Sequence, residues 1–135
     1  MPPDQTELDL SAALGAEPGE SLEVLVLYIP DRDRDGVELG TQRQWVLEAA
    51  GLLARMGGGV SIEPPIEGGW LDEERGQIVW EHPIRVFTFI HPDAFERLLG
   101  ELREFLHRLG RVAKQGEVAV EFGGRFWRIR RFDPS

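Results

Sequence analysis

The chain of 135 residues contains no cysteine, one tyrosine and one lysine among its 15 basic residues. The absence of cysteine excludes disulfides, thiol catalysis and thiolate metal sites. No apolar run approaches the ~20 residues that a membrane-spanning helix needs. Residues 1–20 also lack the basic and apolar regions of a secretory signal. We therefore expect a cytoplasmic protein with no membrane contact.

Negative charge dominates the chain, which has a net charge of −9. Residues 1–20 hold five acids and no Lys or Arg, so we interpret them as an acidic mobile leader before a single domain at 21–135. The C-terminal stretch "RFWRIRRF" interleaves arginines with aromatics, a pattern that can stack single-stranded nucleic acid. Because the overall charge repels polyphosphate, we instead favour an edge strand or a tail that docks on a protein surface.

Apolar periodicity and turn residues predict an alternating order of strands and helices. Thr41 and Gln44 form a capping-box pattern at the start of the first helix, which Gly57-Gly58-Gly59 ends. Pro92 suits the first position of a second helix. The predicted elements are strand 21–30, helix 41–56, strand 60–63, hairpin 68–83, strand 84–90, helix 92–109, strand 117–122 and a strand or extended tail from 125.

This order predicts an α+β fold with a ferredoxin-like, split β-α-β-β-α-β antiparallel sheet, two helices on one face, an extra hairpin and a C-terminal extension. Strands 21–30 and 84–90 are apolar on both faces, as central strands would be. Two helices cover one face only, so apolar residues such as Phe87 and Phe89 need another cover. We expect a homodimer through this sheet face.

The stretch "DRDRDG" at 31–36 matches the opening of an EF-hand calcium loop, with Asp31, Asp33 and Asp35 at its first, third and fifth positions. The twelfth position is Gln42 where the calcium loop needs a bidentate glutamate. A strand also precedes the loop where a helix should. We interpret the stretch as a solvated turn and keep the three aspartates only as a weak metal candidate, with no cofactor expected.

Candidate binding residues are acids and aromatics in the strands. Glu81 and Glu121 each place a charge inside an apolar strand, although an outward charge that blocks edge pairing also explains them. Trp70 and Trp80 flank the predicted hairpin, where they form either a cross-strand pair or a pocket wall. We expect His107 on the solvent face of the second helix, and no residue is assigned a catalytic role.

Several short motifs make the chain from about residue 24 to 129 resemble a group of short bacterial proteins of the ferredoxin-like type. The motifs are an Asp-Gly turn after the first strand (35–36), a helix that ends in glycines (57–59), a Gly-x-Trp hairpin with Gly76 and Glu81, and Gln115 before the last strand. The resemblance implies the fold but no activity. If the group has a site, the resemblance implies Trp70, Glu81 and Gln115.

Two classes of function remain open at this stage. The first is a non-catalytic dimeric module that senses a small molecule or binds a protein partner. The alternative is a small cofactor-free enzyme of the dimeric α+β barrel type, with its substrate in a sheet–helix cleft. A buried acid–base group with a shifted pKa would favour the enzyme, whereas an apolar pocket would favour the module.

Overall fold

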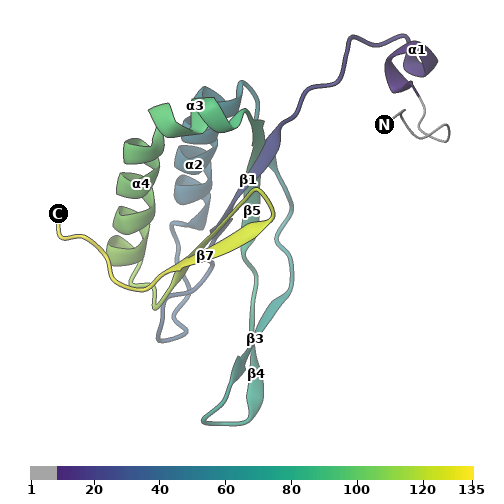
Figure 1. Cartoon of the computed structure of the whole chain (residues 1–135). Helices are drawn as coiled ribbons and strands as arrows, with labels where there is room; N and C mark the ends of the chain where they lie inside the picture. Colours follow the sequence, from purple (N-terminus) through teal and green to yellow (C-terminus); the bar gives the residue numbers. More distant parts are fainter. Residues whose placement is uncertain (1–8) are drawn as a thin grey trace.

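The computed structural model describes residues 9–135 and has a mixed α+β architecture in which helices pack on one face of an antiparallel sheet (Figure 1). The elements are α1 (Leu10–Leu14), β1 (Glu23–Ile29), α2 (Gln42–Gly57), β2 (Ser61–Ile62), β3 (Gly68–Asp72), β4 (Gln77–Glu81), β5 (Ile84–Ile90), α3 (Pro92–Arg97), α4 (Leu99–Val112), β6 (Val118–Phe122) and β7 (Arg125–Ile129). The α+β class predicted from the sequence is confirmed.

The main sheet has the strand order β2-β5-β1-β6-β7, and all of its pairs are antiparallel. β1 and β5 are interior strands, as their apolar sequences predict. The two-residue β2 is an edge, which suits the prolines that follow it at 64–65. β6 is not an edge, because β7 pairs along its outer side. Edge protection is therefore the wrong explanation for Glu121.

The hydrophobic core lies between the sheet and the helices. Alternate residues of β1, Leu25, Leu27 and Ile29, are fully buried against α2 and α4. The end of α2 lies against β5 so closely that a Cβ atom on Gly57 would stand 2.0 Å from Thr88 Oγ1. Because of this contact, only glycine fits at the end of α2.

The opposite face of the sheet carries no helix. It presents Val26 and Tyr28 from β1, Phe87 and Phe89 from β5 and Phe126 from β7. We call these five residues the open face. Phe89 is 54% exposed, whereas neighbouring side chains cover Val26. The expected homodimer through this face stays a prediction.

The helices differ from the sequence prediction at two places. Thr41 occupies the position before α2 but its side chain makes no capping bond, so the predicted capping box is wrong. The second predicted helix is two helices, because Leu98 leaves helical geometry with φ −110° and ψ 11°. The apolar spacing continues across the break, where Gly100, two residues after Leu98, is the one helix-weakening residue in the sequence.

The C-terminal segment that follows β7 folds back over α4, so the C-terminus lies beside that helix (Figure 1). Phe132 lies so close to Gly110 that a Cβ atom there would meet its ring at 2.1 Å. The backbone N–H of Asp133 donates to His107 Nδ1 at 2.8 Å. His107 is consequently buried, and its predicted place on the solvent face is wrong because the segment after β7 covers it.

Two elements lie apart from the main sheet (Figure 1). β3 and β4 form a separate two-stranded hairpin that projects from one end of the molecule, with Gly76 in the left-handed conformation at its turn. At the other end α1 lies away from the sheet and its helices, in the leader that the sequence predicts. Residues 1–8 of this leader lie outside the described residues. Within the described chain no helix has the length and apolarity to cross a membrane.

Candidate functional site: a cleft between the hairpin and the sheet

A cleft of about 330 Å³ lies between the base of the β3–β4 hairpin and the sheet. This volume is at the lower end of the range of small-molecule sites. We call it the hairpin cleft. Its lining residues are Tyr28, Pro30, Ile66, Gly68, Gly69, Trp70, Glu81, Pro83, Gln115, Glu117, Val118, Ala119 and Phe126.

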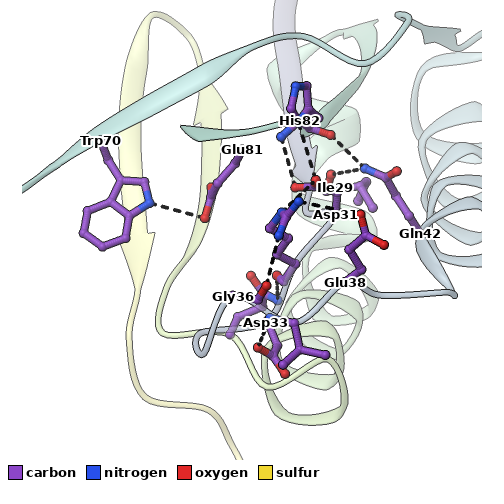
Figure 2. A network of polar contacts seen from close by, with 12 residues as sticks. Ile29, Asp31, Asp33, Gly36, Glu38, Gln42, Trp70, Glu81 and His82 are labelled. Atoms are coloured by element: carbon purple, nitrogen blue, oxygen red, sulfur yellow. Dashed lines mark hydrogen bonds and ion pairs between the residues drawn. The ribbon is translucent and has the colours of Figure 1, made fainter. Parts of the chain in front are cut away.

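One wall comes from the hairpin. Trp70 is opposite Val79 in the strand register, and its indole Nε1 donates to Glu81 Oε1 diagonally across the hairpin at 3.3 Å (Figure 2). This bond aligns an aromatic surface with a carboxylate at the mouth of the cleft. Trp80 is opposite Gly69 and therefore lies on the other hairpin face. The cross-strand tryptophan pair is thus wrong, and Trp80 does not line the cleft.

The sheet supplies the second wall through Tyr28 and Phe126, whose rings meet edge to face with centroids 6.2 Å apart. The Tyr28 hydroxyl donates to Glu121, which lies beside the cleft without lining it. Partial burial, and next the bond to Glu121, raise the pKa of Tyr28 above its usual value of 10.0. Tyr28 is therefore a neutral hydrogen-bond donor across the whole physiological range.

Gln115 and Glu117 border the cleft from the loop before β6. Gln115 Nε2 donates to the carbonyls of Arg32, at 2.8 Å, and Ala113, at 2.9 Å, which fixes its side chain. Glu117 Oε1 lies 3.1 Å from Arg130 Nε and 3.6 Å from Arg128 Nε. These contacts offset the charge of Glu117, so Glu81 is the main negative group of the lining.

The "DRDRDG" loop anchors the base of the hairpin (Figure 2). Asp31 Oδ1 accepts from the backbone N–H of His82 at 3.0 Å. Gln42 Nε2 donates to the His82 carbonyl at 3.1 Å and to the Ile29 carbonyl at 3.2 Å. The sequence pattern favours a solvated turn at this loop. In the structure, the hydrogen bonds of Asp31 and Gln42 connect the end of β1 and the start of α2 to His82, the residue that follows β4.

The metal interpretation of the loop finds no support in the arrangement of its carboxylates. Asp33 Oδ1 accepts from the backbone N–H groups of Asp35, at 2.8 Å, and Val37, at 3.0 Å. These bonds, that to Val37 first, lower the pKa of Asp33 below its usual 3.8. Between residues 9 and 135, no three His, Asp or Glu side chains lie close enough together to hold a metal ion.

Three of the four arginines of the C-terminal stretch make contacts within the protein. Arg128 lies over the Phe126 ring at 4.7 Å and Arg125 over the Trp127 ring at 5.5 Å. Arg130 pairs with Glu117. The stretch is β7 up to Ile129, in agreement with the edge strand that the sequence predicts.

The cleft brings together three of the candidates selected from the sequence, Trp70, Glu81 and Gln115, while Glu121 acts through Tyr28. Sequence reasoning missed Tyr28 and Phe126. One available signal was the alternation of strand 21–30, which puts its single tyrosine on the face opposite the core leucines. Whether any of these residues binds a ligand stays a prediction.

Comparison with known proteins gives a likeness of fold only. No family model and no curated protein matches the chain. A phage SAM lyase in complex with S-methyl-5′-thioadenosine superposes with a TM-score of 0.60 at 16% identity, over 85% of this chain and 94% of that one. A phage SAM lyase in the apo state gives 0.51 at 16% identity, over 88% and 100%. The divalent cation tolerance protein CutA1 from Thermus thermophilus gives 0.43 at 11%, over 85% and 88%. The chain is thus similar in fold to the phage SAM lyase, at a sequence identity that shows the fold alone.

Proposed function

We propose that the chain is a non-catalytic module that binds a small, flat, heteroaromatic molecule in the hairpin cleft. The observation that carries this proposal is the convergence of Trp70, Tyr28 and Phe126 with the polar groups of Glu81 and Gln115 around one cavity. Aromatic walls with a few fixed polar groups are the usual composition of a small-molecule site.

The charges of the cleft support a neutral or positively charged ligand that donates hydrogen bonds. Among the lining residues, two are carboxylates and none is Lys or Arg. An aromatic ring face attracts a cation, and a nearby carboxylate adds to that attraction. A phosphorylated ligand would instead meet the charge of Glu81 with no cation in the lining to offset it.

S-Methyl-5′-thioadenosine, present in the phage lyase structure, is the first compound to test, because it is a neutral purine nucleoside with a flat base. Binding would be measured by calorimetric titration. Truncation of Trp70 to alanine removes a stacking surface worth ~1–3 kcal/mol, so we expect Kd to rise by roughly fivefold or more.

Trp80→Ala is the matched control, since it removes the same side chain from the opposite hairpin face. We expect its Kd to stay within twofold of that of the unaltered protein. Glu81→Gln should weaken a cationic analogue more than the neutral nucleoside. Equal losses in the two tryptophan variants, or no heat from either compound, would reject the hairpin cleft as a nucleoside site.

Catalysis in the same cleft is the second candidate. It is favoured by the Tyr28 hydroxyl, which has a raised pKa and donates to Glu121 beside the cavity. A positioned hydroxyl of this kind can transfer a proton to a leaving group. Incubation of the protein with SAM, followed by chromatography for S-methyl-5′-thioadenosine, tests this candidate. Product that disappears in Tyr28→Phe would replace the module with an enzyme.

Two finer structural expectations belong to this proposal. The order β2-β5-β1-β6 around helices α2 and α4 supports a ferredoxin-like, split β-α-β-β-α-β arrangement, with β3–β4 and β7 as additions. The aromatic open face supports association of two copies through the sheet. Sedimentation of the protein, compared with a Phe89→Glu variant, tests that dimer.

A further inference from the structure

The short helix α1 has a nonpolar side without a partner among residues 9–135 of its own chain. It is capped at both ends, since Asp9 Oδ1 accepts from the Ala12 N–H at 3.2 Å and Gly15 ends it at φ 65°. Its leucines, Leu10 and Leu14, lie one turn apart and are 58% and 73% exposed. An isolated helix of one or two turns is unstable in water, so α1 needs a surface on which to dock.

The same chain has a nonpolar cleft of about 310 Å³ between helices α3 and α4 and strands β6 and β7. We call it the helix–strand cleft. Its apolar lining includes Phe95 and Leu99 from the two helices and Phe122 and Trp127 from the two strands. The rings of Phe95 and Phe122 stack at 4.1 Å, and Leu99 and Trp127 are 45% and 44% exposed. A groove between a helix and a strand suits the apolar side of a short helix.

Charge also matches the cleft to the leader. Arg125 lies over the ring of Trp127, which forms one wall of the cleft. Arg103 also lines the cleft, but Asp133 already pairs with its guanidinium, so Arg125 is the cation on which the charge match depends. Residues 9–22 carry Asp9, Glu17 and Glu20 and no Lys or Arg. An acidic segment next to a cation-bordered groove gains from complementary charge, which guides encounter and orientation.

The course of the leader favours a cleft on another copy. Glu20 Oε1 lies 3.4 Å from His91 Nε2, which holds the base of the leader at the start of α3. From there, residues 15–19 can span ~17 Å when extended, and they carry α1 away from α3 and α4 (Figure 1). Exchange of such an arm between identical chains is a low-cost route to a dimer.

We propose that α1 of one copy docks in the helix–strand cleft of a second copy, with Leu10 and Leu14 against Leu99 and Trp127. The exchange is reciprocal, so each copy donates one arm and accepts one. This contact is separate from the hairpin cleft, so it stands or falls independently of ligand binding there.

Disulfide trapping tests the pairing directly, because the chain has no cysteine of its own. Leu14→Cys in ¹⁵N-labelled protein is mixed with unlabelled Leu99→Cys in a glutathione buffer, and the products are weighed by mass spectrometry. We expect a mixed-mass disulfide at a yield at least tenfold above that of Leu14→Cys with Leu47→Cys, an exposed leucine on α2. Equal yields would overturn the proposal.

Hydrogen exchange of residues 10–14 distinguishes docking of α1 on a second copy from docking in the cleft of its own chain. We expect at least tenfold slower exchange in concentrated protein than in dilute protein, loss of that protection in Leu99→Asp and its retention in Leu47→Asp. On the arm itself, Leu14→Asp should lose protection, whereas Ala12→Asp, on the opposite side of α1, should keep it. Protection that does not depend on concentration would mean docking within one chain, and absence of protection would mean no docking; either result refutes the exchange.

Discussion

Replacement of Gly57 by alanine should destabilise the protein, although alanine is the better helix former. At an unhindered helix position this change stabilises by about 0.5–1 kcal/mol. At position 57 the new methyl group would lie 2.0 Å from Thr88 Oγ1 and 2.6 Å from the carbonyl oxygen of Phe89. The Thr88 hydroxyl can rotate only by giving up its bond to the Gly59 carbonyl, and the strand carbonyl cannot rotate.

The net effect follows from three contributions. Overpacking of this kind costs about 1–3 kcal/mol, and loss of the Thr88 hydrogen bond costs ~1 kcal/mol. Set against the gain in helix propensity, these costs leave a net loss of about 2 kcal/mol, which for a chain of this length lowers Tm by roughly 7 °C.

Thermal unfolding followed by circular dichroism measures this loss, with Gly51→Ala as the matched control. Gly51 lies in the same helix, but its Cβ atom would meet nothing within 4 Å. We therefore expect that variant to be slightly more stable than the unaltered protein. Thr88→Ala in the Gly57→Ala background should restore part of the loss, because one of the two clashing oxygens is removed. If Gly57→Ala proved as stable as Gly51→Ala, α2 would not lie against β5 as described.

Three further predictions concern ionisation and metal binding. The single tyrosine should titrate above pH 10.0 when followed by its absorbance at 295 nm, and Glu121→Gln should bring that titration back toward 10.0. Stability that depends on neutral Tyr28 is fully present below the pKa of tyrosine in the unfolded chain, and it is lost as the pH rises through the raised pKa of the folded protein. Because the pKa of Asp33 is lowered by folding, the stability that this carboxylate contributes is lost as the pH falls. The difference in unfolding free energy between the unaltered protein and Asp33→Asn should therefore be present at pH 7 and shrink in urea titrations below pH 3.8. Millimolar calcium should leave Tm unchanged, because Asp31 and Asp33 already accept backbone N–H groups, and a calcium-dependent rise would show that the loop can rearrange around the ion.

Local sequence patterns predicted the α+β class and most of the helices and strands, because they report on local physics. The apolar run at 84–90, the prolines after β2 and the left-handed Gly76 each constrain their own segment. The break at Leu98 was not predicted, because its apolar neighbours keep helical spacing on both sides and a single glycine, Gly100, is tolerated inside a helix. His107 was misplaced for a related reason, since its burial depends on Phe132 and Asp133, which fold back after two strands have intervened.

The candidate site likewise has one part that local sequence patterns predict and another that depends on long-range strand pairing. Trp70 and Glu81 lie on one hairpin, so their neighbourhood follows from the turn. Tyr28 and Phe126 meet only because β1, β6 and β7 pair side by side. The anchoring role of Asp31 depends on the backbone N–H of a residue 51 positions further along, which no local motif records.

The separate hairpin has a consequence for the strength of any binding at the cleft. β3 and β4 pair only with each other, and a two-stranded ribbon is marginally stable by itself. The hairpin can therefore open while the five-stranded sheet stays folded. Measured affinity is then the intrinsic affinity reduced by the fraction of molecules with a closed hairpin. Warming would weaken binding well below the temperature at which the core melts, and a ligand would protect the hairpin amides from hydrogen exchange before it raised Tm.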